Sequence, residues 1–356
     1  MSFVIEYPNG STTQNFNPSY QGNNVWSIPL QGFSDGHWRW WVVAKDNGDK
    51  GGNTRVSEAL DFSVGGSVVP PDIGDTVANA AWSYGGDIQT SSGRIYFEMP
   101  SNPKWKRWSG YVCSGTVVVD GETGRSVILT AAHCVYDDAN KAFARNVLFI
   151  PNQDQTTGSG TDTNCKNDPI GCWAPSYGVV DVDWTTSVFP DNIPWDYAFY
   201  VVSDQGAHSG NAGTSEALDM ATTPLMMSYV APYVDDGEVG VNSLDFTYAL
   251  GYSYSDDPNF MYCAEDMSTE GNNNWWLPSC GLSGGASGGA WVQPMNLSTG
   301  SGSIISVNSW GYTTSPGMAG PKLSETSAQC VFSVAAVDAG PSDLSDGEAG
   351  LAITCP

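Results

Sequence analysis

Ser287 is the residue whose surroundings in the sequence most clearly favour chemistry. It lies between two glycine pairs in the stretch C-G-L-S-G-G-A-S-G-G-A-W, residues 280–291. Because glycine tolerates backbone angles that other residues avoid, this loop can bend sharply and present the hydroxyl with N–H groups beside it. That arrangement suits a nucleophile and its oxyanion donors. A Gly/Ser-rich linker or a tight turn is the alternative for this stretch alone, although an apolar strand resumes at residues 290–292.

A nucleophilic serine needs a neighbouring base, and His133 is the best placed of the three histidines. It follows the apolar run V-I-L-T-A-A and precedes Cys134. Histidine titrates near neutral pH and can accept the serine proton. His37 lies among tryptophans and His208 lies in a Gly/Ser-rich loop. Taken alone, His133 could also be an ordinary structural histidine.

Asp196 is the candidate carboxylate. It opens an apolar run, residues 197–202, whose aromatic and β-branched content predicts a buried strand. A carboxylate at the start of such a strand is costly unless it is paired. A histidine N–H is a suitable partner, and this bond would fix the tautomer of the base. The sequence holds 38 acidic residues, so Asp196 alone could also be a turn residue.

Together these stretches resemble the trypsin/chymotrypsin-like serine peptidases. The shared motifs are C-S-G-T (113–116), T-A-A-H-C (130–134), D-Y-A (196–198) and G-G-A-S-G-G-A (284–290), in that family's order of His, Asp and Ser. A later V-N-S-W-G-Y stretch (307–312) is similar to secreted bacterial peptidases of the glutamyl-endopeptidase type. The resemblance covers roughly residues 90–335.

The resemblance implies a secreted serine endopeptidase that cleaves protein or peptide substrates through an acyl-enzyme, with no metal or organic cofactor. His133 would be the general base and then acid, Asp196 the orienting carboxylate and Ser287 the nucleophile. The N–H groups of Gly285 and Ser287 would form the oxyanion hole. The strand edge that pairs with the substrate would be Ser309, Trp310 and Gly311. The alternative is a non-catalytic binding or adhesion protein that reuses the fold.

Several residues depart from the family pattern. Ala286 replaces the aspartate that receives the new N-terminus of animal trypsins on activation, so we expect no activation through that ion pair. Arg94 and Ile95 look like an activation cleavage site, and we interpret them as strand residues. Leu282 and Asn308 fall near positions where glutamyl endopeptidases place polar pocket-wall residues, which leaves the substrate preference open.

Composition bounds the other functions. The formal net charge of −25 disfavours binding to nucleic acid or anionic membranes, and no apolar run is long enough to span a bilayer. We expect a monomer. Eight cysteines predict four disulfides and an oxidising compartment. Since residues 1–5 carry no signal-peptide pattern, export is inferred from the cysteines.

The resemblance pairs Cys113 with Cys134, next to the base. Cys165 and Cys172 bracket a short loop that ends a polar insertion, residues 152–172. The acidic groups of this insertion could hold calcium, but no EF-hand spacing is present and a solvated loop is preferred. Cys263 and Cys280 would brace the loop leading to Ser287. The remaining pair is Cys330 and Cys355. Other connectivities stay open on sequence alone.

The 41 glycines and 21 prolines, with few helical patterns, predict an all-β protein. Residues 1–66 show about four strands (3–7, 25–30, 38–44 and 59–64) and resemble part of a fibronectin type III-like β-sandwich. Since a whole sandwich has about seven strands, we expect an incomplete module. Trp38, Trp40 and Trp41 could form a sugar-binding platform, but strand packing is preferred. Residues 67–89 would be a linker. Residues 90–356 would form the peptidase-like domain of two packed six-stranded antiparallel β-barrels, with a helix from Thr326 to Val337 near the end.

Overall fold

The structure is a computed structural model of the whole chain. It describes residues 76–355 except 123, 161, 205–207, 210–216, 236, 238, 338–339 and 342–347, and it describes the strands of the first 75 residues. The chain divides into two compact units, Met1–Asp72 and Ile73–Pro356. Each unit is described by itself.

The first unit contains seven strands where the sequence analysis expected about four. Its longest strand, β5, pairs with β1, β6 and β7, while β2 adds to β1 and β3 pairs with β4. The additional strands are short or polar, as in T-T-Q-N-F for β2, and therefore lack the apolar alternation that predicts a strand. The resemblance to a fibronectin type III-like module stays a prediction, and the side chain of Trp38 lies outside the described residues. The strands are β1 (Ser2–Glu6), β2 (Thr12–Phe16), β3 (Ser19–Gly22), β4 (Val25–Ser27), β5 (Gly36–Lys45), β6 (Thr54–Val56) and β7 (Leu60–Val64).

Part of the segment expected to be a linker is ordered structure in the second unit. Strand β8 (Val77–Ala81) pairs with β21 (Met261–Asp266), and helix α1 (Asp87–Ser91) leads directly into β9. The sequence V-A-N-A-A of β8 has a single β-branched residue and no aromatic one, so it lacks the composition that predicts a strand, and none of its residues is buried. We therefore place the start of the second unit before residue 90.

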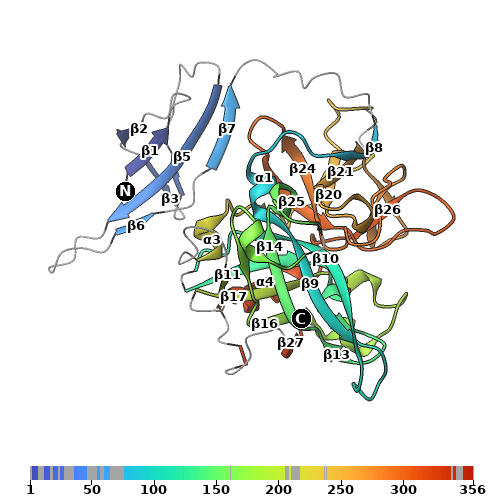
Figure 1. Cartoon of the computed structure of the whole chain (residues 1–356). Helices are drawn as coiled ribbons and strands as arrows, with labels where there is room; N and C mark the ends of the chain where they lie inside the picture. The colour runs from blue at the N-terminus through green and yellow to red at the C-terminus, as the bar shows by residue number, and fades with distance from the viewer. Residues whose placement is uncertain are drawn as a thin grey trace. The chain divides into compact units, whose positions relative to one another are not determined.

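After β8 and α1, the second unit forms a curled sheet that is antiparallel except for the parallel pairing of β16 with β27 (Figure 1). Six of its strands run in the order β14-β9-β10-β11-β17-β16, and β15, β18 and β27 extend it at the two ends. Strands β11 and β17 are almost wholly buried, as their apolar runs predict. The strands are β9 (Ser92–Pro100), β10 (Trp108–Val118), β11 (Arg125–Thr130), β14 (Arg145–Pro151), β15 (Cys172–Trp173), β16 (Tyr177–Asp181), β17 (Ala198–Ser203), β18 (His208–Ser209) and β27 (Gly350–Ile353).

A second set of six strands shares part of this connectivity, and its strands lie in two sheets, β19-β25-β24-β20-β21-β8 and β22-β23-β26. In both sets the first strand pairs with the second and the fourth, and the third pairs with the sixth. The two sets agree with the all-β, two-barrel architecture that was expected. The second set is β20 (Phe246–Gly251), β21, β23 (Asn274–Leu277), β24 (Ala290–Asn296), β25 (Ser301–Val307) and β26 (Met318–Pro321), with β19 (Met226–Met227) and β22 (Ser268–Glu270) at its edges.

Short elements complete the unit. The predicted C-terminal helix is present as α4 (Ala328–Val337), and it packs on β16 and β17. The others are the hairpin β12 (Tyr136–Asp137) and β13 (Ala142–Phe143), the helices α2 (Val182–Thr186) and α3 (Leu218–Ala221), and the 3-10 turns η1 (Ala132–Cys134), η2 (Gln153–Gln155), η3 (Cys165–Asn167), η4 (Ile193–Trp195) and η5 (Tyr254–Asp256).

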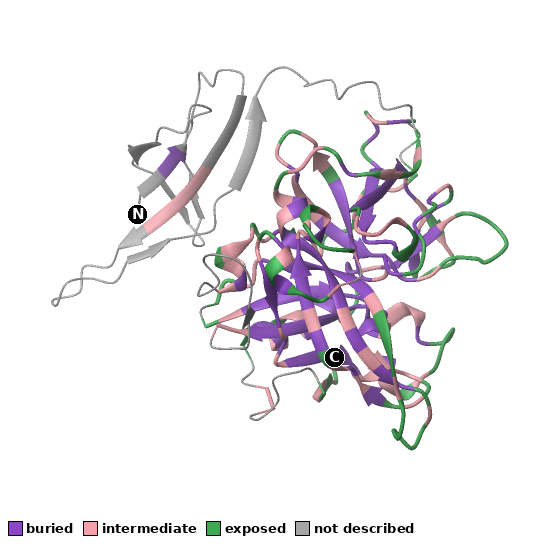
Figure 2. Ribbon diagram, in the orientation of Figure 1, coloured by how far each residue is buried: buried purple, intermediate pink, exposed green. Residues whose placement is uncertain are grey.

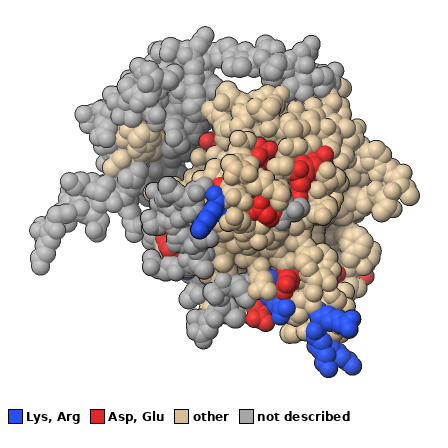
Figure 3. All heavy atoms as spheres, viewed as in Figure 1, with Lys and Arg blue, Asp and Glu red and all other residues tan. Residues whose placement is uncertain are grey.

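The strands of the second unit carry most of its buried residues, as Figure 2 shows. One apolar cluster includes residues from both sets of strands, and a smaller one lies within the second set. No helix in the described part of the chain is long and apolar enough to cross a membrane. On the face shown in Figure 3, acidic side chains are scattered, whereas the largest group of basic side chains lies at the lower right.

Four disulfides link the cysteines in the pairs that the sequence analysis favoured. Cys113–Cys134 joins β10 to η1, and Cys165–Cys172 closes a seven-residue separation within the polar insertion. Cys263–Cys280 ties β21 to the loop before Ser287, and Cys330–Cys355 ties α4 to the C-terminal end. The first and third of these disulfides brace the two loops that carry His133 and Ser287.

Candidate active site

His133 and Asp196 meet because they leave the same end of two paired strands. Thr130, the last residue of β11, lies opposite Ala198, the first residue of β17. The short turns η1 and η4 then carry His133 and Asp196 beyond this pair. Antiparallel pairing thus brings together residues that are separated by 63 positions in the sequence.

The carboxylate of Asp196 holds the backbone and the ring of His133 at once. Its Oδ1 accepts a hydrogen bond from the His133 N–H at 2.9 Å, and its Oδ2 lies 2.8 Å from Nδ1 of the ring. The Asp196 side chain is 5% exposed, whereas that of His133 is 34% exposed. The imidazole is therefore oriented by a buried group while its other edge remains open.

Burial and the carboxylate act in opposite directions on the pKa of His133. Burial lowers that pKa, but the charge of Asp196, its hydrogen bond and the charge of Asp138 outweigh burial and raise it above the usual value. Burial also raises the pKa of Asp196, yet the charge of His133 and hydrogen bonds from His133 and Ser309 lower it overall. Both directions favour the charged form of each partner.

Ser287 lies at one end of the paired strands β24 and β25 of the second set. Ala290 of β24 lies opposite Val307 of β25, so the residues before β24 and after β25 share one end. There the N–H of Gly288 donates to the Asn308 carbonyl at 2.7 Å. A Cβ on Gly288, where φ is +80°, would lie 2.1 Å from Thr130 Oγ1. The loop can pack this closely against β11 only because glycine follows Ser287.

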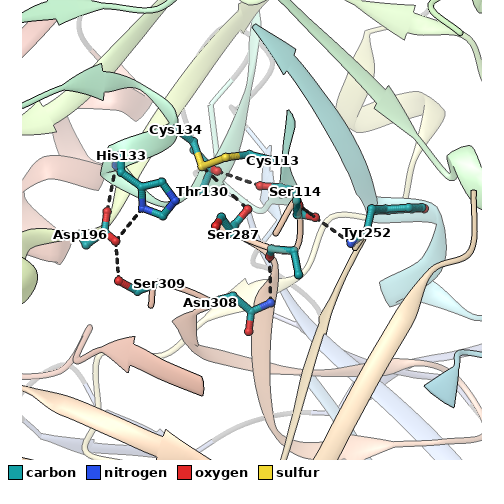
Figure 4. Close-up of a disulfide and its surroundings, with 12 residues drawn as sticks. Cys113, Ser114, Thr130, His133, Cys134, Asp196, Tyr252, Ser287, Asn308 and Ser309 are labelled. Carbon is teal, nitrogen blue, oxygen red and sulfur yellow. Dashed lines mark hydrogen bonds and ion pairs between the residues drawn. A yellow bond between two sulfur atoms is a disulfide. The ribbon is translucent and has the colours of Figure 1, made fainter. Parts of the chain in front are cut away.

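A ring of contacts brings Ser287 next to the His133–Asp196 pair. The Ser287 carbonyl lies 3.9 Å from the sulfur of Cys134, the residue after His133. On the other side, the Ser309 hydroxyl donates to Asp196 Oδ2. Figure 4 shows the imidazole between Asp196 and Ser287. Among the described residues, the Ser287 hydroxyl makes no hydrogen bond.

Two backbone N–H groups of the Ser287 loop, those of Gly285 and Ser287, have no hydrogen-bond partner among the described residues. Gly285 is buried and adopts φ +99°, and a Cβ there would lie 2.8 Å from the Tyr252 carbonyl oxygen. Only glycine satisfies both the backbone conformation and this close approach.

Comparison with known proteins was made at the levels of sequence and structure. No family model and no curated protein matches the sequence. The structure is similar to a thermostable serine protease, AL20, from an extremophilic microorganism, with a TM-score of 0.50 and 22% identity over 70% of this chain and 97% of that one. It also matches a Glu endopeptidase solved in complex with MPD, with a TM-score of 0.46 and 16% identity over 73% and 96% of the two chains.

The fold is that of the trypsin/chymotrypsin-like peptidases. In this trypsin/chymotrypsin-like fold, residues 309–311 follow β25 beside the site. The Ser309 and Trp310 N–H groups donate to the Ala319 carbonyl, and Ala319 N–H donates to Trp310 at 2.7 Å. Across the described residues, the N–H and carbonyl of Gly311 have no backbone partner.

Asn308, which falls near a pocket-wall position of the glutamyl endopeptidases, contacts other protein groups in this structure. It is wholly buried, and its side chain makes three hydrogen bonds. Nδ2 donates to the carbonyls of Leu250 and Ala286, and Oδ1 accepts from Trp291 Nε1. With its polar atoms all paired inside the protein, Asn308 braces the Ser287 loop and is unavailable to a substrate. Leu282, the other pocket-wall candidate, is 7% exposed.

Sequence reasoning missed two hydroxyl groups of the site. Ser309 was assigned only a backbone role, yet its buried hydroxyl bonds Asp196. Ser114 was noted only as part of a motif, yet it contacts the Ser287 loop through backbone and side chain. Their positions next to recognised motifs were the only signal, because neither contact is local in sequence.

One group of side chains in the described residues has the spacing of metal ligands, namely Cys113, His133 and Cys134. The two sulfurs form a disulfide, so they offer no thiolate to a metal. Arg94 and Ile95, which resembled a cleavage site, lie within β9, and both are fully buried. His208 lies in β18, and its side chain is outside the described residues, as is that of His37.

Proposed function

We propose that this chain is a secreted serine endopeptidase in which Ser287 is the nucleophile, His133 the general base and Asp196 the carboxylate that orients it. The observation that carries the proposal is the His133–Asp196 pair beside Ser287, with the open N–H groups of Gly285 and Ser287 next to it. The four disulfides support an oxidising compartment. The serine protease and Glu endopeptidase names of the two similar structures agree with this chemistry.

The reaction follows from this geometry. Ser287 Oγ attacks the carbonyl carbon of the scissile bond while Nε2 of His133 takes the hydroxyl proton. The carbonyl oxygen becomes an anion that accepts hydrogen bonds from the two free N–H groups. When the C–N bond breaks, the imidazolium returns its proton to the leaving amine. Water then attacks the acyl-enzyme and loses a proton to His133. The bond between the acyl carbon and Ser287 Oγ breaks, His133 returns the proton to Oγ, and the carboxylic acid product leaves.

A groove beside Gly285 offers space for the leaving-group side of a peptide. Its cavity volume is about 680 Å³. Tyr111 and Tyr254 line this groove, and about half or more of each residue is exposed. Glu98 also lines it, and its side chain is partly exposed. We therefore infer that residues after the scissile bond lie against an aromatic surface. The groove is lined by Tyr96, Phe97, Glu98, Gly110, Tyr111, Val112, Asn146, Tyr254 and Gly285.

A labelling experiment tests the function directly. The folded full-length chain is incubated with an active-site phosphonate and with a peptide library, and the modified residue is identified by mass spectrometry. Labelling of Ser287 and peptide cleavage are expected, and Ser287→Ala should lower kcat by about 10⁶ and abolish labelling. A wild-type chain that is folded, unlabelled and inactive on every peptide would contradict the proposal and return the non-catalytic binding role.

A further inference from the structure

Ser114 connects the three parts of the site that surround Ser287. This serine of β10 is 1% exposed. Its N–H donates to the Ser287 carbonyl at 2.7 Å, and its carbonyl accepts from Thr130 Oγ1 at 2.8 Å. Its hydroxyl donates to the Gly285 carbonyl at 2.9 Å and accepts from the Tyr252 N–H at 2.8 Å. Figure 4 shows Ser114 between Thr130 and Tyr252.

The hydroxyl acts on Gly285, a residue of the loop that has little conformational preference of its own. Gly285 has φ +99°, and a glycine can leave such a conformation with little steric resistance. The carbonyl of Gly284 precedes its N–H, and its own carbonyl follows its Cα. The Gly284 carbonyl accepts from Tyr254 N–H at 2.7 Å, and the Gly285 carbonyl accepts from Ser114 Oγ.

These two hydrogen bonds fix the direction of the Gly285 N–H. Because a peptide unit is planar and trans, holding the Gly284 carbonyl aims the Gly285 N–H the opposite way. Holding the Gly285 carbonyl sets the next peptide plane and so the ψ angle of the same residue. Without the Ser114 hydroxyl, the second of these restraints is lost.

We propose that Ser114 is a positioning residue for the oxyanion site. Its hydroxyl links Gly285 to Tyr252 at the end of β20, and this link holds the Gly285 N–H toward the place where negative charge develops. The proposal rests on the proposed peptidase function and adds to it a side chain that touches neither substrate nor reacting atoms. Both partners of the hydroxyl are backbone groups, so its removal leaves a buried donor, Tyr252 N–H, and a buried acceptor, the Gly285 carbonyl, unpaired.

The expected effect is on the transition state more than on substrate binding. Removing a complete oxyanion donor typically costs about 10²–10³ in kcat, and misdirecting one should cost less. Ser114→Ala is therefore expected to lower kcat about 10- to 100-fold with less than a threefold change in KM. Affinity for a peptide aldehyde, whose hemiacetal oxygen uses the same N–H groups, should fall in proportion to kcat.

The test uses full-length protein with active sites titrated by a phosphonate. Ser114→Thr, which keeps the hydroxyl, should restore most of kcat, and Ser91→Ala is the matched control. Ser91 is also buried, and its hydroxyl donates to the Asp87 carbonyl in α1 at 2.9 Å. Ser91→Ala should leave kcat and aldehyde affinity unchanged. If Ser114→Ala does not fold, Ser114→Gly replaces it, with the same expected direction.

The outcomes distinguish the positioning role of Ser114 from the peptidase function. If the wild type is active and labelled but Ser114→Ala keeps its kcat and aldehyde affinity, the positioning role is overturned and the peptidase function stands. The same holds if Ser114→Thr is as impaired as Ser114→Ala. If the wild type itself is neither active nor labelled, the peptidase function fails, and the role of Ser114 fails with it.

Discussion

The hydroxyl of Ser309 donates to Oδ2 of Asp196, the same oxygen that lies 2.8 Å from Nδ1 of His133. Asp196 thus receives three hydrogen bonds, from the His133 N–H, from its ring and from Ser309. A buried carboxylate stays ionised only when such donors compensate for lost water. Ser309 follows β25 of the second set of strands, whereas Asp196 precedes β17 of the first set. The third hydrogen bond to the carboxylate therefore comes from the other set of strands.

Ser309→Ala should therefore weaken catalysis without destroying it. A hydrogen bond to a charged group is worth about 1.5–3 kcal/mol, and two donors to Asp196 remain. We expect kcat to fall about tenfold with KM nearly unchanged, measured on a cleaved library peptide. Ser298→Ala, at an exposed serine before β25, is the control and should keep the wild-type kcat. Equal kcat values for the two variants would contradict the role of the Ser309 hydroxyl.

Asp196→Asn should be far more damaging. The asparagine can keep the approximate geometry but cannot stabilise the imidazolium, and it can favour the wrong ring tautomer. In the serine peptidase template this change lowers kcat by about 10⁴, and a loss of that order is expected here. Asp191→Asn, at an exposed aspartate in the same loop, is the matched control. A loss below tenfold in Asp196→Asn would show that another group orients His133.

The pH dependence follows from the raised pKa of His133. The base works only as neutral imidazole, so kcat/KM should fall as pH drops through this pKa, with a midpoint above the usual value of about 6.5. In Asp196→Asn the lowering effect of burial is no longer opposed by the carboxylate, so the midpoint should move to lower pH. Rates measured across the acid limb check both shifts, and an unmoved midpoint in the variant would contradict the coupling.

The same pair has opposite effects on stability at the two ends of the pH range. The raised pKa of His133 contributes stability that is present below the unfolded value and is lost as pH rises through the folded pKa. The lowered pKa of Asp196 contributes stability that is present above about 3.9 and is lost as pH falls through the folded pKa.

The sequence was most informative where one short motif carries both backbone shape and chemistry. The G-G-A-S-G-G and A-A-H-C stretches each combine a reactive side chain with the small residues that allow close packing, so Ser287 and His133 could be selected from sequence. Strands β11 and β17 of the second unit followed from their buried apolar runs, whereas β8 did not. The contact of Ser309 with Asp196 spans 113 positions, and no local pattern encodes it.

Polar residues in the interior were interpreted less well. Asn308 was placed near a pocket-wall position by the resemblance to glutamyl endopeptidases, and the hydrogen-bond partners of its side chain lie at Leu250, Ala286 and Trp291. Their approach depends on how three strands pack. The short strands β2 and β3 were not predicted, because their composition carries no strand pattern. They are strands because they pair with β1 and β4.

Asn308→Ala should therefore lower stability as well as activity. It leaves the Trp291 Nε1–H unpaired in a buried place and removes one donor from the Leu250 and Ala286 carbonyls, of which Ala286 keeps the Gly289 N–H. Each unsatisfied buried group costs about 1–3 kcal/mol. We expect a loss of about 3 kcal/mol and a Tm lower by about 6–12 °C, measured by calorimetry. Asn273→Ala, at an exposed asparagine, should leave Tm unchanged. A residue that contacts substrate would instead change KM at constant Tm. That result would contradict the bracing role of Asn308.

Arg94 and Asp257 form a buried ion pair between β9 and the loop before β21. The Arg94 side chain is fully buried, that of Asp257 is 12% exposed, and the guanidinium also lies over the ring of Tyr252, 5.5 Å from its centroid. Burial raises the pKa of Asp257, and the charge and hydrogen bond of Arg94 oppose this effect. The pair therefore joins the two sets of strands next to the residue that Ser114 contacts.

Asp257→Asn should destabilise the second unit strongly, because it leaves the Arg94 charge buried and unpaired, a change that typically costs about 3–5 kcal/mol. Replacing both partners, as in Arg94→Met with Asp257→Asn, removes the charge itself and should recover much of that loss. The free energy of unfolding of the two variants, followed by denaturant titration of the full-length chain, makes the comparison. If the double variant is less stable than Asp257→Asn alone, Arg94 stabilises the junction through packing over Tyr252 more than through its charge, and the ion-pair account is wrong.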